Sequence, residues 1–91
     1  MVSLQQQVDP RVDEQVVLDY RRELFRAAAI LVRQQVQAST WKAFWRTCIE
    51  GISIDQACTE LKMSPSAIYI ARSRVVHRLR ETIAQWENED A

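Results

Sequence analysis

The sequence predicts a small all-α domain of four helices whose C-terminal part is a helix-turn-helix. The chain has 91 residues, 47% of them hydrophobic, which suits one domain with a single packed core. It contains one glycine and two prolines, so its composition favours helices over turn-rich sheets. Apolar residues recur every three or four positions, which is the period of amphipathic helices.

The first predicted helix runs from Asp13 to about Gln37. Residues 1–12 show no sustained periodicity and include Pro10, so we expect a flexible lead-in or the remnant of a linker. Arginines along the helix alternate with acidic residues, which favours intrahelical ion pairs on a solvated face. The predicted apolar face consists of Val16, Tyr20, Leu24, Ala27, Ala28, Leu31 and Val32.

The second predicted helix has Ser39 or Thr40 as its N-cap and ends before Gly51, where a helix C-terminus favours a left-handed residue. Its apolar stripe is Trp41, Phe44, Trp45, Cys48 and Ile49. Because the three tryptophans of the chain lie in apolar stripes, core packing is favoured over stacking on nucleic-acid bases. Cys48 and Cys58 match no metal-ligand spacing, so we expect two reduced, buried thiols.

Two further helices come in close succession. Ser53 and Gln56 have the spacing of a capping box and begin a third helix at about 53–62. Ser64 then caps the fourth helix, with Pro65 at its first position, where a missing N–H costs nothing. Since only about two residues separate these helices, they must cross steeply, as in a helix-turn-helix. Apolar residues of the fourth helix are Ile68, Val75, Leu79, Ile83 and Trp86.

The net charge of zero hides a segregation of charge along the fourth helix. Five basic and no acidic residues lie from Lys62 to Arg80, whereas residues 81–91 carry four acidic residues and no basic one. We take residues 13–87 as the domain and 88–91 as an acidic tail. The exposed side of the helix begins with small and polar residues and continues with arginines, which suits base reading combined with phosphate contact. The candidate DNA-binding residues are Ser64, Ser66, Ala67, Tyr69, Ile70, Ser73, Arg74, His77 and Arg78.

Other function classes find no support in the sequence. His77 is the only histidine and has no acid or nucleophile at a suggestive spacing, and one glycine cannot build a glycine-rich phosphate loop. We therefore expect no enzymatic activity, catalytic residue, metal or cofactor. No uncharged apolar run reaches about 18 residues and the N-terminus lacks the features of a signal peptide, so we expect a cytoplasmic protein without a membrane partner.

The segment from Thr40 to Glu81, TWKAFWRTCIEGISIDQACTELKMSPSAIYIARSRVVHRLRE, resembles region 4 of bacterial extracytoplasmic-function sigma factors. The matching elements are Thr40–Trp41, Glu50–Gly51–Ile52–Ser53, and Met63–Ser64 with Ala67–Ile68–Tyr69. The resemblance implies a domain that recognises the minus-35 element of duplex promoter DNA while docking on the flap of RNA polymerase, and it implies an anti-sigma factor as a further partner. Where the family usually has glycine in the turn, this chain has Lys62, for which a positive φ costs on the order of 1 kcal/mol.

Nothing in the chain resembles region 2 of these factors, so we expect either part of a longer sigma factor or a free-standing region-4-like protein. Two alternatives stay open. A protein-interaction regulator would bind a sigma factor or RNA polymerase through the first or the second helix. A stand-alone dimeric helix-turn-helix transcription regulator would need an exposed apolar seam, for which Val17, Phe25 and Ile30 are the candidates.

Overall fold

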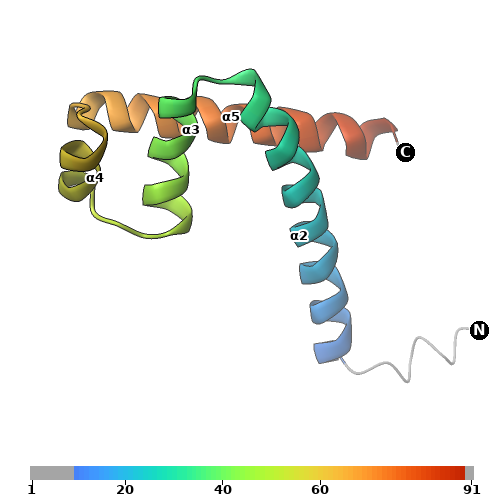
Figure 1. Cartoon of the computed structure of the whole chain (residues 1–91). Helices are drawn as coiled ribbons and strands as arrows, with labels where there is room; N and C mark the ends of the chain where they lie inside the picture. The colour runs from blue at the N-terminus through green and yellow to red at the C-terminus, as the bar shows by residue number, and fades with distance from the viewer. Residues whose placement is uncertain (1–9, 90–91) are drawn as a thin grey trace, which may run out of the picture.

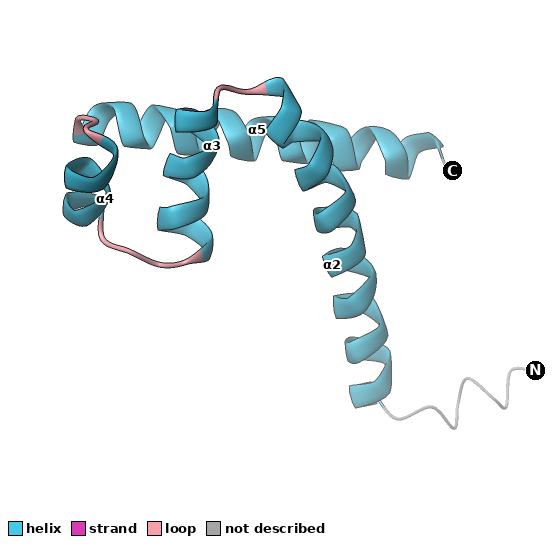
Figure 2. Ribbon diagram, viewed as in Figure 1, coloured by secondary structure: helices cyan, strands magenta, loops and turns pink. Residues whose placement is uncertain are grey.

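The computed structural model describes residues 10–89, and within that range every regular element is a helix (Figures 1 and 2). Four α-helices and one π-helical turn succeed one another along the chain. Their bounds are α2 (Pro10–Gln35), α3 (Ala38–Phe44), η1 (Trp45–Ile49), α4 (Ile54–Leu61) and α5 (Pro65–Glu89). The predicted small all-α fold is confirmed.

Helix α5 is the long element against which the other helices pack (Figure 1). Helices α3 and α4 lie beside each other and cross the N-terminal half of α5 steeply, while α2 contacts α5 further along. The N-terminal part of α2 points away from the other helices. The body therefore consists of α3, η1, α4, α5 and the C-terminal part of α2.

The buried side chains form two clusters. One joins α2, α3 and α5, and the other, built largely from alanines, joins α3, α4 and α5 around Ile68. Trp41 is 8% exposed, and Trp45 and Trp86 pack against the first cluster, so the predicted core role of the tryptophans is confirmed. The first cluster is Ala28, Val32, Trp41, Phe44, Val75 and Leu79, and the second is Ala43, Ala57, Ile68 and Ala71.

The apolar face predicted for α2 is only partly correct. Ala28 and Val32 are fully buried, but Val16, Tyr20 and Leu31 are exposed, Val16 to 61%. Helix α2 carries apolar side chains on two sides, and only its C-terminal half meets the body. Periodicity therefore located the helix correctly but did not identify the side that the body covers. The α2 residues of the first cluster are Ala28 and Val32, and Phe25 and Ala29 of α2 pack against it together with Val36, which follows the helix.

Both serine caps are confirmed, but the predicted cap of the second helix is wrong. Ser53 Oγ accepts a hydrogen bond of 3.0 Å from the Gln56 N–H, and Ser64 Oγ accepts one of 3.1 Å from the Ala67 N–H. Helix α3 begins at Ala38, earlier than either predicted serine or threonine cap, and the residue before it makes no side-chain capping bond. The chain enters α3 in extended conformation, so the helix starts without a cap.

The turn between α4 and α5 has the strained residue that its sequence predicts. Lys62 adopts φ 56° and ψ 46°, in the left-handed region, and its N–H donates to the carbonyl oxygen of Cys58. This is the helix ending that glycine usually provides, at a cost on the order of 1 kcal/mol for another residue. Gly51, with φ 76°, is left-handed as predicted.

The end of the α3 segment differs from the regular helix that was predicted. In η1 the Glu50 N–H donates to the Trp45 carbonyl oxygen at 3.0 Å, five residues back. Such a π-turn contains one residue more than an α-helical turn and rotates the side chains after it. Cys48 and Ile49 are consequently exposed rather than buried, so the prediction of two buried thiols is wrong for Cys48. Cys58 is partly buried against the second cluster.

The helix bounds shift the predicted edges of the domain slightly. Helix α2 begins at Pro10, so residues 10–12, which we expected in the lead-in, are helical, and residues 1–9 lie outside the described residues. Helix α5 extends to Glu89, and residues 90–91 of the predicted acidic tail also lie outside. Among the helices of residues 10–89, none combines the length and apolar character needed to cross a bilayer.

Candidate nucleic-acid interface

The N-terminal half of α5 divides its side chains between the core and solvent. Ile68, Ala71 and Val75 are buried, whereas Tyr69 and Ile70 are 53% and 52% exposed. Since side chains three or four positions apart share a side of a helix, the exposed residues form a continuous surface. Six of the nine candidate DNA-binding residues lie on it: Ser66, Tyr69, Ile70, Ser73, Arg74 and His77.

The other three candidate residues are engaged differently. Ser64 Oγ accepts a hydrogen bond from the Ala67 N–H and so caps α5. The side chain of Ala67 is half-buried. Arg78 Nη1 donates a hydrogen bond of 3.2 Å to Gln35 Oε1 at the end of α2. These contacts give the three residues roles in the fold, and their contact with DNA stays a prediction.

Two side-chain pairs order the exposed surface of α5. Arg72 Cζ lies 5.5 Å from the centroid of the Tyr69 ring, within the range of a cation–π interaction. Further along the helix, His77 Nε2 lies 3.1 Å from Glu81 Oε1. The first pair fixes a guanidinium beside the exposed tyrosine, and the second places a carboxylate at the C-terminal edge of the surface.

A hollow of about 340 Å³ lies on one flank of α5, where the helix meets η1. Arg72 and Arg80 belong to this hollow, although they are not among the binding residues predicted from the sequence. For Arg80 the spacing gave a usable signal, since Tyr69, Ser73 and Arg80 recur at four and seven positions on one helix line. The lining residues are Cys48, Tyr69, Arg72, Ser73, Val76, His77 and Arg80.

Helix α4 is tied to the rest of the body by Arg46 in η1. Its Nε and Nη2 donate to the carboxylate of Glu60 at 3.1 and 2.8 Å, and its Nη1 donates to Glu50 Oε1 at 2.8 Å. The hydrogen bonds to Glu60, and then the one to Glu50, raise the pKa of Arg46 above its ordinary value. This forked pairing holds α4 at a fixed distance from η1 and so helps to orient the turn that leads into α5.

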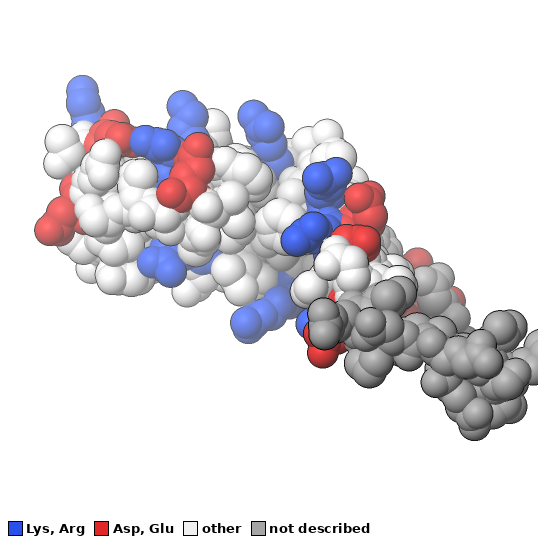
Figure 3. Space-filling model, turned by 90° about the horizontal axis from the view of Figure 1, so that it is seen from below, with Lys and Arg blue, Asp and Glu red and all other residues white. Residues whose placement is uncertain are grey.

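On the face that Figure 3 shows, the charged side chains do not gather into one basic surface. Lys and Arg side chains are interspersed there with Asp and Glu side chains. On α2, Arg22 pairs with Asp19 at 3.8 Å and Arg26 with Glu23 at 3.7 Å, which confirms the predicted intrahelical pairing. The part of α5 that precedes Glu81 carries four arginines and no acidic residue.

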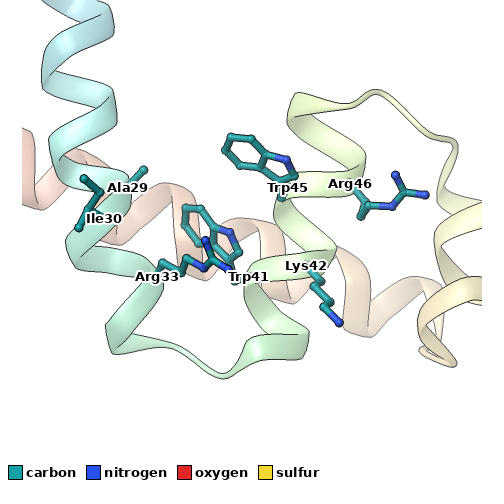
Figure 4. Close-up of a pocket in the computed structure, with 7 residues that line it drawn as sticks. All are labelled: Ala29, Ile30, Arg33, Trp41, Lys42, Trp45 and Arg46. Atoms are coloured by element: carbon teal, nitrogen blue, oxygen red, sulfur yellow. The ribbon is translucent and has the colours of Figure 1, made fainter.

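A second concave surface lies on another side of the molecule, between α2 and the α3–η1 segment (Figure 4). This groove of about 410 Å³ combines the rings of Trp41 and Trp45 with the apolar side chain of Ile30. Basic side chains from all three elements border it. The lining residues are Ala29, Ile30, Arg33, Trp41, Lys42, Trp45 and Arg46.

Within the part of the chain that the structure describes, no three His, Cys, Asp or Glu side chains come together to hold a metal ion. The resemblance to sigma-factor region 4 rests on the motifs between Thr40 and Glu81. No family model matches the chain, and no curated protein or solved structure matches it significantly.

Proposed function

We propose that this chain binds duplex promoter DNA through the exposed side of α5, in the manner of region 4 of a sigma factor that directs RNA polymerase to promoters. The observation that carries the proposal is the division of α5 into a buried side and an exposed polar side directly after a sharp turn. Ile68 and Val75 are fully buried, while Ser66, Ser73 and Arg74 are open to solvent.

The geometry at the turn supports this use of α5. A recognition helix must project from the body so that the residues of its first turns reach base edges in the major groove. The left-handed residue Lys62 ends α4, and Ser64 starts α5 two residues later. The two helices cross steeply (Figure 1), which leaves the exposed side of α5 without a covering helix.

The chemistry of the exposed side suits both kinds of DNA contact. The hydroxyls of Ser66 and Tyr69 suit base edges or the sugar–phosphate backbone, and the Arg74 guanidinium suits guanine or a phosphate. Only about four or five basic residues contribute, and the net charge of the chain is zero. The affinity for free DNA should consequently be modest, and attachment to RNA polymerase would supply the rest.

Replacing Arg74 by alanine should weaken binding to a preferred duplex by about 1–3 kcal/mol, or roughly 5- to 150-fold, if the guanidinium makes a bidentate base contact. The duplex is first obtained by selection from a randomised library, and affinity is then measured by fluorescence anisotropy at low salt. The preference for the selected duplex over a scrambled one should fall as well.

Arg22→Ala is the matched control, because it removes the same side chain from the exposed surface of α2. It should bind both duplexes like the wild type. If wild type and Arg74→Ala are indistinguishable at low salt, Arg74 has no role in recognition. If selection enriches no sequence, with or without core RNA polymerase, the proposed function is wrong.

A second candidate function, a regulator that binds a sigma factor or RNA polymerase, is favoured by the groove between α2 and α3. Exposed apolar side chains beside basic ones suit a partner helix with apolar and acidic residues. Ile30 is 64% exposed and lies in this groove, so it is available to such a helix without serving the core.

Replacing Ile30 by glutamate should weaken binding to core RNA polymerase at least about tenfold, which corresponds to about 1.4 kcal/mol, because it places an acidic group against an acidic partner. Val16→Glu makes the same change on an exposed part of α2 outside the groove and should leave binding unaltered. Surface-immobilised polymerase provides the measurement. Equal losses in both variants would mean that charge, rather than this groove, determines binding.

A further inference from the structure

We infer that the hollow between η1 and α5 holds the DNA backbone, with Arg72 and Arg80 contacting phosphates while the neighbouring side of α5 faces the bases. This inference rests on the proposed function and assigns a second, sequence-independent half to the same interface. The hollow measures about 340 Å³, and none of the buried residues of the two core clusters lines it.

The groups that line the hollow are those that bind phosphate oxygens. Arg72 and Arg80 contribute guanidinium groups, and Tyr69 and Ser73 contribute hydroxyls. Arg72 Cζ lies 5.5 Å from the centroid of the Tyr69 ring, so the guanidinium is partly ordered in the free protein. The entropy that the Arg72 side chain loses on binding DNA is correspondingly smaller. Eight residues separate the two arginines, or about 12 Å along the helix, so they would reach different phosphates.

The guanidinium groups of this hollow form no ion pair with a described acidic side chain. Among the described side chains, no carboxylate lies within 4 Å of Arg72 or Arg80. The carboxylate of Glu81 lies 3.1 Å from Nε2 of His77, a residue of the lining, although Glu81 itself does not line the hollow. The hollow is thus a small region of positive charge on a protein with no net charge, as a polyanion site requires.

The position of the hollow identifies the polyanion as duplex DNA. Ser73 and His77 belong both to the hollow and to the exposed side of α5. A helix that lies in a major groove has a phosphate backbone along its flank, and phosphate contacts there fix its orientation. Exposed Tyr69 also belongs to both, so one duplex could contact the residues that face the bases and those that face the backbone at the same time.

The double substitution Arg72→Gln/Arg80→Gln should reduce the salt dependence of DNA binding. Each lost phosphate contact lowers the slope of log affinity against log salt by about 0.9, so the slope should fall by about two. Selected and scrambled duplexes should lose affinity to the same extent, and the ratio between them should persist. Arg72 is partly buried, so its replacement could also affect folding. The single variant Arg80→Gln changes only an exposed side chain and should lower the slope by about one.

The control is Arg22→Gln/Arg26→Gln, which removes the same charge from the exposed surface of α2. Its slope should match that of the wild type. An equal fall in both double variants would overturn the inference, because net charge rather than the hollow would then govern binding.

Cys48 gives a second measurement that depends on position rather than charge. Its exposed thiol lines the hollow, so bound duplex should slow its alkylation by iodoacetamide, measured by mass spectrometry against Cys58 of the same chain. At a duplex concentration that half-saturates the wild type, the protection should be weaker in Arg72→Gln/Arg80→Gln, because this variant binds DNA less tightly. Sequence-selective duplex binding with an unprotected Cys48 and an unchanged slope would overturn the inference alone. Absence of any duplex binding by the wild type would reject the proposed function, and protection by single-stranded RNA only would reject duplex DNA as the occupant.

Discussion

Ile68→Ala should lower the free energy of unfolding by about 2–5 kcal/mol, because it removes three carbons from a site with no exposed surface. Ile68 is the largest member of the cluster that joins α3, α4 and α5, and its other members are alanines that cannot expand to fill the cavity. For a domain of this size the loss is a large part of the total stability. Urea denaturation monitored by circular dichroism measures it.

Ile70→Ala is the control for this prediction. It makes the same chemical change two residues along the same helix, where the side chain is exposed, so stability should change by no more than about 0.5 kcal/mol. Comparable losses in both variants would mean that burial at the joint of α4 and α5 does not stabilise the fold.

Trp41→Ala should cost about 3–5 kcal/mol of stability, since it removes the largest side chain from the cluster between α2, α3 and α5. The Trp41 ring lies 5.3 Å from that of Phe44 and 5.9 Å from that of Trp45, centroid to centroid, so two aromatic contacts are lost with it. The higher helix propensity of alanine offsets less than about 1 kcal/mol. Thermal unfolding monitored by circular dichroism should show a marked fall in Tm.

Trp45→Ala removes the same side chain from a half-buried position and should cost about 1–2 kcal/mol. A greater loss from Trp45→Ala than from Trp41→Ala would contradict the assignment of Trp41 to the centre of the cluster. Either substitution abolishes the stacking of Trp41 on Trp45, so that contribution is lost in both variants. The difference between their losses of stability therefore reports the burial of each ring.

The parts of the fold that the sequence predicted well are those with local causes. Ser53 and Ser64 cap their helices because a serine oxygen satisfies backbone N–H groups that have no helical partner. Gly51 and Lys62 end helices at the expected positions, and the lysine adopts the left-handed conformation despite its side chain. These features involve residues within a few positions of one another, so a short stretch of sequence is enough to predict them.

The errors arose where tertiary contacts or an irregular turn decide the outcome. Periodicity placed Val16 and Tyr20 on a buried face, but the body reaches only the C-terminal half of α2. Cys48 belonged to a regular apolar stripe in the sequence, and the π-turn moved it to the surface beside α5. The candidate site shows the same limit, because Arg72 and Arg80 gain significance only when η1 and α5 together form a hollow.

The extra residue in η1 is accommodated locally, within a single turn of the helix. Because a π-turn absorbs its extra residue within one turn, deleting Thr47 should restore an ordinary α-helical turn and leave the segment that follows close to its present position. The pairing of Arg46 with Glu60 could then still form. A deletion inside α5, which has no extra residue, would instead rotate every later side chain by about 100° relative to the body.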